Sequence, residues 1–247
     1  MTCRIGNVIS RQQNSSAYKN GPAYQVVAVG GSFCLFVTAD VSISHVDDEN
    51  SFSSIETAQN VEGGTRLVTA AYAGSIAINN RLTIAMSNVN INSCSAASIY
   101  NGVSGSSASA VGGACLLSSN LSPFVELSRR RYIYTSPSRY SLTASTFNGN
   151  AATSSHYLIA NYSIDSILTV LGGAIAILHS DDFCTNQCKS PDGESLDHYL
   201  SFSVVNFSNN SANAAFPNRI SVPVSASVAK SVVLGGSLCV TLSCFFL

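Results

Sequence analysis

The sequence predicts an all-β fold, a right-handed parallel β-helix (a solenoid) with loops of variable length. Three observations predict it: a composition suited to strands and turns, a recurring Gly-Gly signature and a recurring Asn-rich signature. Only 10% of the residues are charged, against about 25% in an ordinary soluble domain. Val and Ile favour strands, whereas the abundant Ser, Asn and Gly favour turns. A hydrophobic content of 46% argues against a disordered chain.

The first signature is an apolar strand, a Gly-Gly pair, a small residue and a second apolar strand. Gly accepts positive φ and lets neighbouring backbones approach, so each pair is expected at a corner of a coil. The pairs are Gly30-Gly31, Gly112-Gly113, Gly172-Gly173 and Gly235-Gly236. A degenerate copy runs from Tyr72 to Ile78, whereas Gly63-Gly64 lacks the flanking pattern and is interpreted as loop.

The second signature is an alternating strand that ends in Asn and Ala. It occurs at 142–152, 203–212 and 86–96, and most faintly at 7–17. Phe147 and Phe207 are expected to point into the core, and Asn150 and Asn210 to occupy turns. Because Asn tolerates the left-handed region and its amide can bond to the Asn of the next coil, these positions predict a ladder.

The two signatures alternate along the chain, as the repeats of a solenoid do when the core is constant and the loops vary. Asn-rich elements near residues 14, 92, 150 and 210 precede the Gly-Gly pairs near 30, 112, 172 and 235. We therefore expect one β-helix domain over 1–247, with 37–85 matching the repeat least. Right-handedness follows from the usual preference of parallel crossovers. Loops are expected at 180–198 and 213–230, and a β-sandwich with close hairpin turns is the alternative fold.

These paired motifs resemble the polymorphic outer-membrane protein repeat, a right-handed parallel β-helix module of the pectin-lyase-like type. The resemblance depends on four tetrapeptides: Gly172-Gly173-Ala174-Ile175, Gly112-Gly113-Ala114-Cys115, Phe147-Asn148-Gly149-Asn150 and Phe207-Ser208-Asn209-Asn210. It covers about half the chain, mostly from residue 86 onward. The resemblance implies a surface-exposed, adhesive protein, because the bacterial members of the family are adhesive passenger domains.

The eight cysteines fall into two main kinds. Cys34, Cys115 and Cys239 follow Gly-Gly pairs inside apolar runs and are interpreted as small core residues. Cys184 and Cys188 lie in a polar stretch, where a local disulfide would form in an oxidising compartment. Zinc is the alternative, with His179 and His198 nearby, but Cys-x-x-x-Cys alone does not complete a metal site.

Five Asn-x-Ser sequons permit glycosylation on a secretory route. They begin at Asn14, Asn120, Asn161, Asn206 and Asn209. The first residues lack a basic start and an apolar segment, so no signal peptide is visible, and we expect a fragment of a longer protein. The apolar stretch Ser231–Leu247 is either a last coil or a membrane anchor.

Charged groups that could serve sugar chemistry are interpreted as solvated parts of loops. The acidic ones are Asp181-Asp182, Asp192, Glu194, Asp197 and Asp47-Asp48-Glu49. The basic run Arg129-Arg130-Arg131 precedes Tyr132, Tyr134 and Tyr140 and could grip an acidic sugar. His45, His156, His179 and His198 are scattered, and no nucleophile elbow or phosphate-binding loop is present. We therefore predict no catalytic, cofactor or metal site.

Three functions remain open from the sequence. The first is a non-enzymatic secreted or cell-surface protein with an adhesive or structural role, whose partners are cell-surface glycans or proteins. The second is a carbohydrate-binding or polysaccharide-degrading β-helix, which requires charged side chains of successive coils, such as Arg131, Asp181 and Asp197, to converge. The third is a truncated gene product without a function of its own. A net charge of −1 gives no electrostatic reason to expect nucleic acid, and membrane association would come through the parent protein.

Overall fold

The computed structural model contains β-strands and no helix in its described part, which comprises ten ranges of the chain. These ranges are 8–13, 24–37, 40–59, 67–80, 83–102, 107–118, 139–158, 166–178, 199–216 and 229–241. The strands form four sheets, and all paired neighbours within each sheet are parallel. The fold is a stack of β-helical coils, as the sequence predicts.

The four sheets, named A to D, each collect one strand from successive coils. Sheet A contains β1 (Val8–Gln13), β5 (Phe52–Gln59), β9 (Ser95–Gly102), β13 (Ala151–Leu158) and β17 (Ser211–Ala215). Sheet B contains β2 (Tyr24–Val29), β6 (Leu67–Tyr72), β10 (Ser107–Val111), β14 (Ser166–Leu171) and β18 (Ala229–Leu234). Sheet C contains β3 (Phe33–Val37), β7 (Ile76–Asn80), β11 (Cys115–Ser118), β15 (Ile175–Leu178) and β19 (Leu238–Thr241). Sheet D contains β4 (Val41–Glu49), β8 (Thr83–Asn92), β12 (Arg139–Asn148) and β16 (Tyr199–Ser208).

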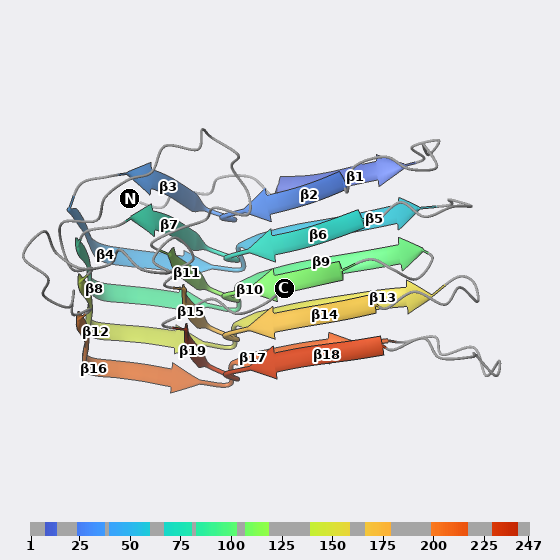
Figure 1. The fold of residues 1–247 in the computed structure, drawn as a ribbon. Coiled ribbons are helices and arrows are strands. Elements are labelled where there is room, and N and C mark those ends of the chain that lie inside the picture. The colour runs from blue at the N-terminus through green and yellow to red at the C-terminus, as the bar shows by residue number, and fades with distance from the viewer. Residues whose placement is uncertain are drawn as a thin grey trace, which may run out of the picture.

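Each coil passes through sheets D, A, B and C in that order. The first coil contributes β1 to β3 within the described ranges, and the second to fifth coils begin with β4, β8, β12 and β16. Figure 1 shows the coils stacked one below another, with sheets A and B on the right and sheets C and D on the left. The region of weakest repeat match, 37–85, therefore contains a complete second coil, β4 to β7.

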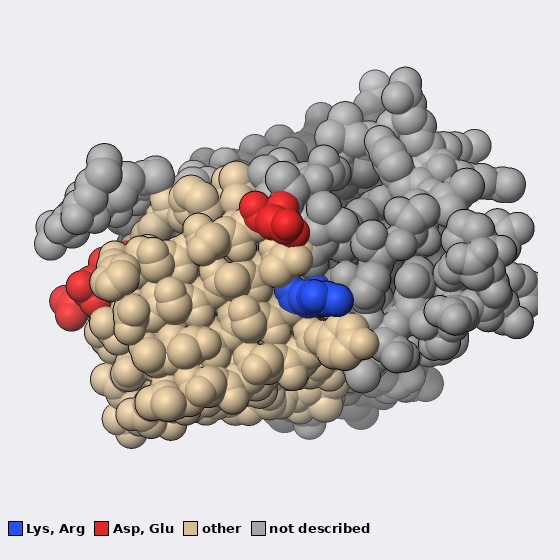
Figure 2. Space-filling model, turned by 90° about the vertical axis from the view of Figure 1, so that its left-hand side faces the viewer, with Lys and Arg blue, Asp and Glu red and all other residues tan. Residues whose placement is uncertain are grey.

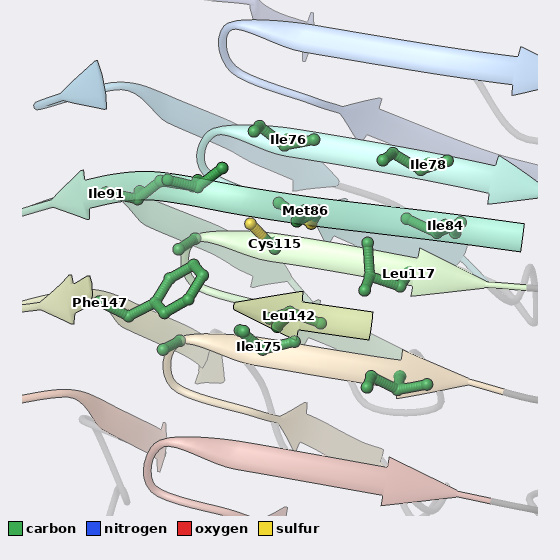
Figure 3. Packing of buried hydrophobic residues seen from close by; sticks show 14 of the residues in the cluster. Ile76, Ile78, Ile84, Met86, Ile91, Cys115, Leu117, Leu142, Phe147 and Ile175 are labelled. Carbon is green, nitrogen blue, oxygen red and sulfur yellow. The ribbon is translucent and has the colours of Figure 1, made fainter. Parts of the chain in front are cut away.

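The main core lies between sheets C and D. Figure 3 shows side chains of both sheets, among them Met86 and Cys115, directed into the space that the coils enclose. Phe147 is fully buried there and stacks on Phe207 with ring centroids 5.5 Å apart, which confirms the inward orientation predicted for Phe147. The space between sheets A and B contains small residues such as Ala110 and Ala152, together with larger side chains that include Tyr100 and Leu168.

Sheet C is apolar on both faces. Cys115 and Leu117 face sheet D, whereas Leu116 belongs to a second cluster with Val111 and Leu171 of sheet B. Strands buried on both faces have continuous apolar sequences and do not alternate, because both orientations meet other side chains. This explains the unbroken apolar runs that follow the Gly-Gly pairs.

Residues of positive φ form three columns that run through the coils. The first, between sheets B and C, contains Gly30, Ala73, Gly112, Gly172 and Gly235. The second, between sheets D and A, contains Asn50, Ser93, Gly149 and Asn209. The third lies within sheet D and contains His45, Asn88, Ala144 and Val204. These columns include every residue of positive φ in the described ranges, so the coils repeat in backbone conformation even where side chains differ.

The corner between sheets B and C requires its second glycine because two backbones meet there. A Cβ on Gly113 would lie 1.9 Å from the carbonyl oxygen of Gly173 and 2.5 Å from the carbonyl carbon of Ala151. Ala151 follows the corner between sheets D and A in the fourth coil, whereas Gly113 lies at the corner between sheets B and C in the third. The two kinds of corner therefore touch inside the stack. Gly236, on the last coil, has nothing within 4 Å of the same position.

The predicted glycine repeat is confirmed, including its degenerate copy. The amide of Gly113 donates to the carbonyl of Gly172 at 3.0 Å, and that of Gly173 to Gly235 at 3.0 Å. In the degenerate copy, Ala73 has the conformation of the first glycine, with φ 52°. Gly63-Gly64 lies outside the described residues.

The prediction of an Asn-rich element at 7–17 is wrong. In β1, Val8 lies opposite Ser53 of β5, so this strand belongs to sheet A and follows a corner. The equivalent element of the second coil ends at Asp48 and Ser51, where the sequence lacks both Phe and Asn. The expected loop at 213–230 is also too long, since 213–215 belong to β17 and 229–230 to β18. The other expected loop, 180–198, lies outside the described residues.

Candidate functional site

Asn150 and Asn210 form the predicted ladder at the corner between sheets D and A, but the left-handed backbone expected of them lies one residue earlier, at Gly149 and Asn209. The Oδ1 atom of Asn210 accepts hydrogen bonds from the backbone amide and the Nδ2 atom of Asn150, at 2.9 and 3.0 Å. The Nδ2 atoms also donate to strand carbonyls, from Asn150 to Ile91 and from Asn210 to Phe147. One coil up, the Oδ1 atom of Asn150 accepts from the amide of Cys94 at 2.9 Å. Each side chain thus satisfies backbone groups that the turn would leave open.

In the second coil a carboxylate replaces the inward aromatic residue. Asp48 lies opposite Ile91, which lies opposite Phe147, so it occupies the core column. The Ser51 hydroxyl donates to one carboxylate oxygen of Asp48 at 2.7 Å, and the Ser75 hydroxyl donates to the other. Asp48 is half-buried. The column therefore ends in a hydrogen-bonded polar group at its N-terminal end.

The acidic run Asp47-Asp48-Glu49 is divided between two faces of sheet D. Asp48 points inward, whereas Asp47 and Glu49 point outward, as alternation along a strand requires. Asp47 accepts a hydrogen bond from the side-chain amide of Asn90 at 2.8 Å. The three carboxylates therefore do not converge on one substrate or ion, and no group of metal-ligating side chains occurs within the described ranges.

The outer face of sheet D has few charges and consists mostly of hydroxyl and amide groups, interrupted by the exposed Ala144 and Val204 of the left-handed column. Its residues are Ser42, Ser44, Asp47 and Glu49 of β4; Ala85, Ser87, Asn90 and Asn92 of β8; Ser141, Thr143, Thr146 and Asn148 of β12; and Ser201, Ser203, Asn206 and Ser208 of β16. All of them are exposed or half-buried. In-register pairing aligns them in rows, with strands about 4.8 Å apart.

Charged side chains are sparse over the part of the surface that can be described. Figure 2 shows one side of the molecule, on which acidic and basic residues occupy small areas of an otherwise uncharged surface. Arg139 and Tyr199 lie opposite each other at the start of β12 and β16, with the guanidinium carbon 5.3 Å from the ring centroid. The outward residues of sheet D therefore combine a polar centre with few charges at the margins.

Three of the four described free cysteines are buried. Cys115 and Cys239 are core residues as predicted, but the prediction for Cys34 is wrong because this residue is exposed. Cys34 lies on β3, the first strand of sheet C, so no further described strand covers it. Burial and the nearby Asp48 raise the pKa of Cys94 to about 12, and burial raises the pKa of Cys115 well above its usual range. Buried thiols of this kind are unreactive.

The other predicted site residues are distributed as follows. Tyr140 is buried in the main core, His156 is buried beside Tyr100, and His45 is exposed. Asn206 and Asn209 are exposed, and the Asn209 amide donates to Asn148 at 3.1 Å. The remaining candidates lie outside the described residues: Asn14, Asn120, Asn161, Arg129, Arg130, Arg131, Tyr132, Tyr134, His179, Asp181, Asp182, Cys184, Cys188, Asp192, Glu194, Asp197 and His198.

The apolar segment Ser231–Leu247 continues the solenoid over its described part. Residues 231–241 lie in β18, the glycine corner and β19, which pair with β14 and β15 of the preceding coil. No described helix is long and apolar enough to span a membrane.

Two features of sheet D were not predicted from the sequence. The inward orientation of Asp48 was not predicted because a run of acidic residues usually indicates a solvated loop. The left-handed column within sheet D was not predicted either, because its four residues share no side-chain type.

The sequence matches no protein-family model and no curated protein, and the structure matches no solved structure.

Proposed function

We propose that the chain is a non-enzymatic β-helix of a secreted or cell-surface protein, with an adhesive or structural role. The observation that carries this proposal is the outer face of sheet D, where rows of Ser, Thr and Asn cross four strands with charges only at its margins. Such a surface offers many weak hydrogen bonds to an extended partner and no focus for catalysis.

The partner we propose is a neutral cell-surface glycan. Hydroxyl and amide groups donate to and accept from sugar hydroxyls, and a nearly uncharged face gives no advantage to an acidic polymer. The described acidic run supports a binding role over a polysaccharide-degrading one, because Asp47 and Glu49 are separated from Asp48 by the sheet. The two exposed sequons, Asn206 and Asn209, are compatible with secretion.

A relation to the polymorphic outer-membrane protein repeat is part of the same proposal. Its support is the regular alternation of Phe147-x-x-Asn150 and Phe207-x-x-Asn210 with the glycine corners. In that family an adhesive role accompanies this alternation, which agrees with a binding face built from successive coils.

The proposal is tested by binding to immobilised polysaccharides. The 247-residue chain should bind neutral polymers such as mannan more tightly than acidic alginate. Thr143→Glu with Ser203→Glu places two charges in neighbouring strands of the outer face of sheet D, and should weaken binding about tenfold. Thr153→Glu with Asn213→Glu places the same charges on neighbouring strands of sheet A and should leave binding unchanged.

Two outcomes would count against the proposal. Equal loss of binding in both double variants would remove sheet D as the site. Release of reducing or unsaturated sugars during incubation would replace adhesion with polysaccharide cleavage.

A further inference from the structure

The left-handed column divides the outer face of sheet D into two halves. This column consists of His45, Asn88, Ala144 and Val204, and all four residues are exposed. The hydroxyl half precedes the column and comprises the outward residues of 42–44, 85–87, 141–143 and 201–203. The amide half follows the column and comprises the outward residues of 47–49, 90–92, 146–148 and 206–208. A ligand on this face therefore meets two surfaces of different chemistry.

The two halves differ in how their polar groups are already bonded. In the amide half, the Nδ2 atom of Asn90 donates to Asp47 at 2.8 Å, and the Ser208 hydroxyl donates to Asn148 at 2.9 Å. In the hydroxyl half, the side chains of the described strands form no such bonds with one another. A ligand on the amide half must compete with bonds inside the protein, whereas on the hydroxyl half it exchanges bonds with solvent alone.

Hydroxyl groups recur once per coil in the hydroxyl half. One complete row consists of Ser44, Ser87, Thr143 and Ser203, each lying opposite the next. This row crosses all four described strands of sheet D, with about 4.8 Å between neighbours. A second row lies two residues earlier in each strand and is interrupted at Ala85. The chemical repeat of this half therefore runs along the stack of coils.

An aromatic ring borders the hydroxyl half. Tyr199 begins β16 and points outward, because strand alternation places the next residue, Leu200, opposite the buried Tyr140. The guanidinium carbon of Arg139 lies 5.3 Å from the centroid of the Tyr199 ring. Sugar rings pack their C–H groups against aromatic rings of this kind. The outward positions of the amide half contain no aromatic residue in the described strands.

We propose that the hydroxyl half holds a linear neutral glycan that runs along the stack with one sugar per coil, an inference that rests on the glycan-binding role proposed above. An extended chain of pyranose sugars advances per sugar by a distance close to the strand spacing, so successive sugars meet equivalent residues. The sugar hydroxyls donate to and accept from the Ser and Thr hydroxyls of the row. The four described strands of sheet D would hold about four sugars.

Two matched double variants test which half binds. Thr143→Val with Ser203→Ala removes two hydroxyls from neighbouring strands of the hydroxyl half. Thr146→Val with Asn206→Ala removes two polar groups from the same strands in the amide half. On immobilised β-1,4-linked mannan, with protein made without glycosylation, the first variant should raise the dissociation constant about tenfold and the second should leave it unchanged. Urea unfolding checks that both variants fold.

Manno-oligosaccharides of increasing length test the direction of the ligand. As competitors for mannan binding by the 247-residue chain, they should bind more tightly with each added sugar up to about four and gain little beyond that length. A ligand that lay along one strand would instead pass over the left-handed column and contact both halves.

The outcomes separate this inference from the proposed function. Equal weakening in both double variants, weakening in the amide half alone, or no gain beyond two sugars would overturn the inference and leave sheet D as the binding face. Normal binding of both double variants would overturn it in the same way if Thr143→Glu with Ser203→Glu still weakens binding. Normal binding of that charged variant as well would remove sheet D as the site, and the proposed function with it.

Discussion

At the residue scale, the left-handed column within sheet D shows how backbone conformation is imposed on unsuitable side chains. Positive φ is rare outside Gly and Asn, and a β-branched residue there is strained. The column nevertheless contains His45, Ala144 and Val204 as well as Asn88. Beside this column, the Ser145 hydroxyl accepts from the backbone amide of Val89 and donates to the carbonyl of Thr143, so both backbone groups are paired.

Val204→Asn is expected to stabilise the protein by about 1 kcal/mol. Val204 has φ 55° and is 83% exposed, so the substitution relieves strain and removes little buried surface. Asn occupies the same column at Asn88. The measurement is the midpoint of urea unfolding. Val205→Asn, at the neighbouring half-buried position, is the matched control and should lower the midpoint.

The cysteines give a second prediction at this scale, based on their pKa values. Burial and Asp48 raise the pKa of Cys94 to about 12, and burial raises that of Cys115. Both thiols should therefore stay protonated and resist iodoacetamide at pH 8, whereas Cys34, which is exposed although partial burial also raises its pKa, should be alkylated faster than either. Peptide mapping of native and urea-unfolded protein measures this. Native alkylation of Cys94 at the rate of Cys34 would contradict the buried assignment.

At the element scale, the corners were more predictable than the strands they connect. Gly and Asn are typical of turns, so Gly112-Gly113 and Asn150 could be recognised as corners from their type, although the positive φ beside Asn150 belongs to Gly149. In the second coil only the degenerate glycine corner was recognised, because Asp48 and Ser51 replace Phe and Asn in its other signature. Tertiary packing holds this coil in the repeat although its sequence carries little of the pattern.

Gly113→Ala should destabilise the protein by about 3 kcal/mol or more, because the added Cβ meets two backbones. The clashing atoms are the Gly173 oxygen at 1.9 Å and the Ala151 carbon at 2.5 Å, and neither can rotate away as a side chain would. Gly236→Ala is the control at the equivalent position, where nothing lies within 4 Å. Thermal unfolding monitored by circular dichroism compares the two. Similar losses in both variants would mean that the corners do not touch.

At the scale of the whole molecule, contacts run almost entirely between successive coils. Paired strands come from adjacent coils in every sheet, so each coil depends on its immediate neighbours. The order of the motifs was predictable from the sequence for this reason, since each coil must present the same core positions to the next. The exposed apolar residues of β16 and the inward Asp48 of β4 could not be predicted from the sequence, because both depend on which described strand lies last in its sheet.

Hydrogen exchange should therefore be slowest in the third and fourth coils and fastest in the fifth. The amides of β8 and β12 are flanked by strands on both sides, whereas β16 has one described neighbour and an exposed apolar interior. In a nearest-neighbour solenoid an end coil can open without disrupting the others, so its opening costs less than global unfolding. Mass-spectrometric hydrogen exchange measures this gradient. Uniform protection from β4 to β16 would instead mean that the coils unfold as one cooperative unit.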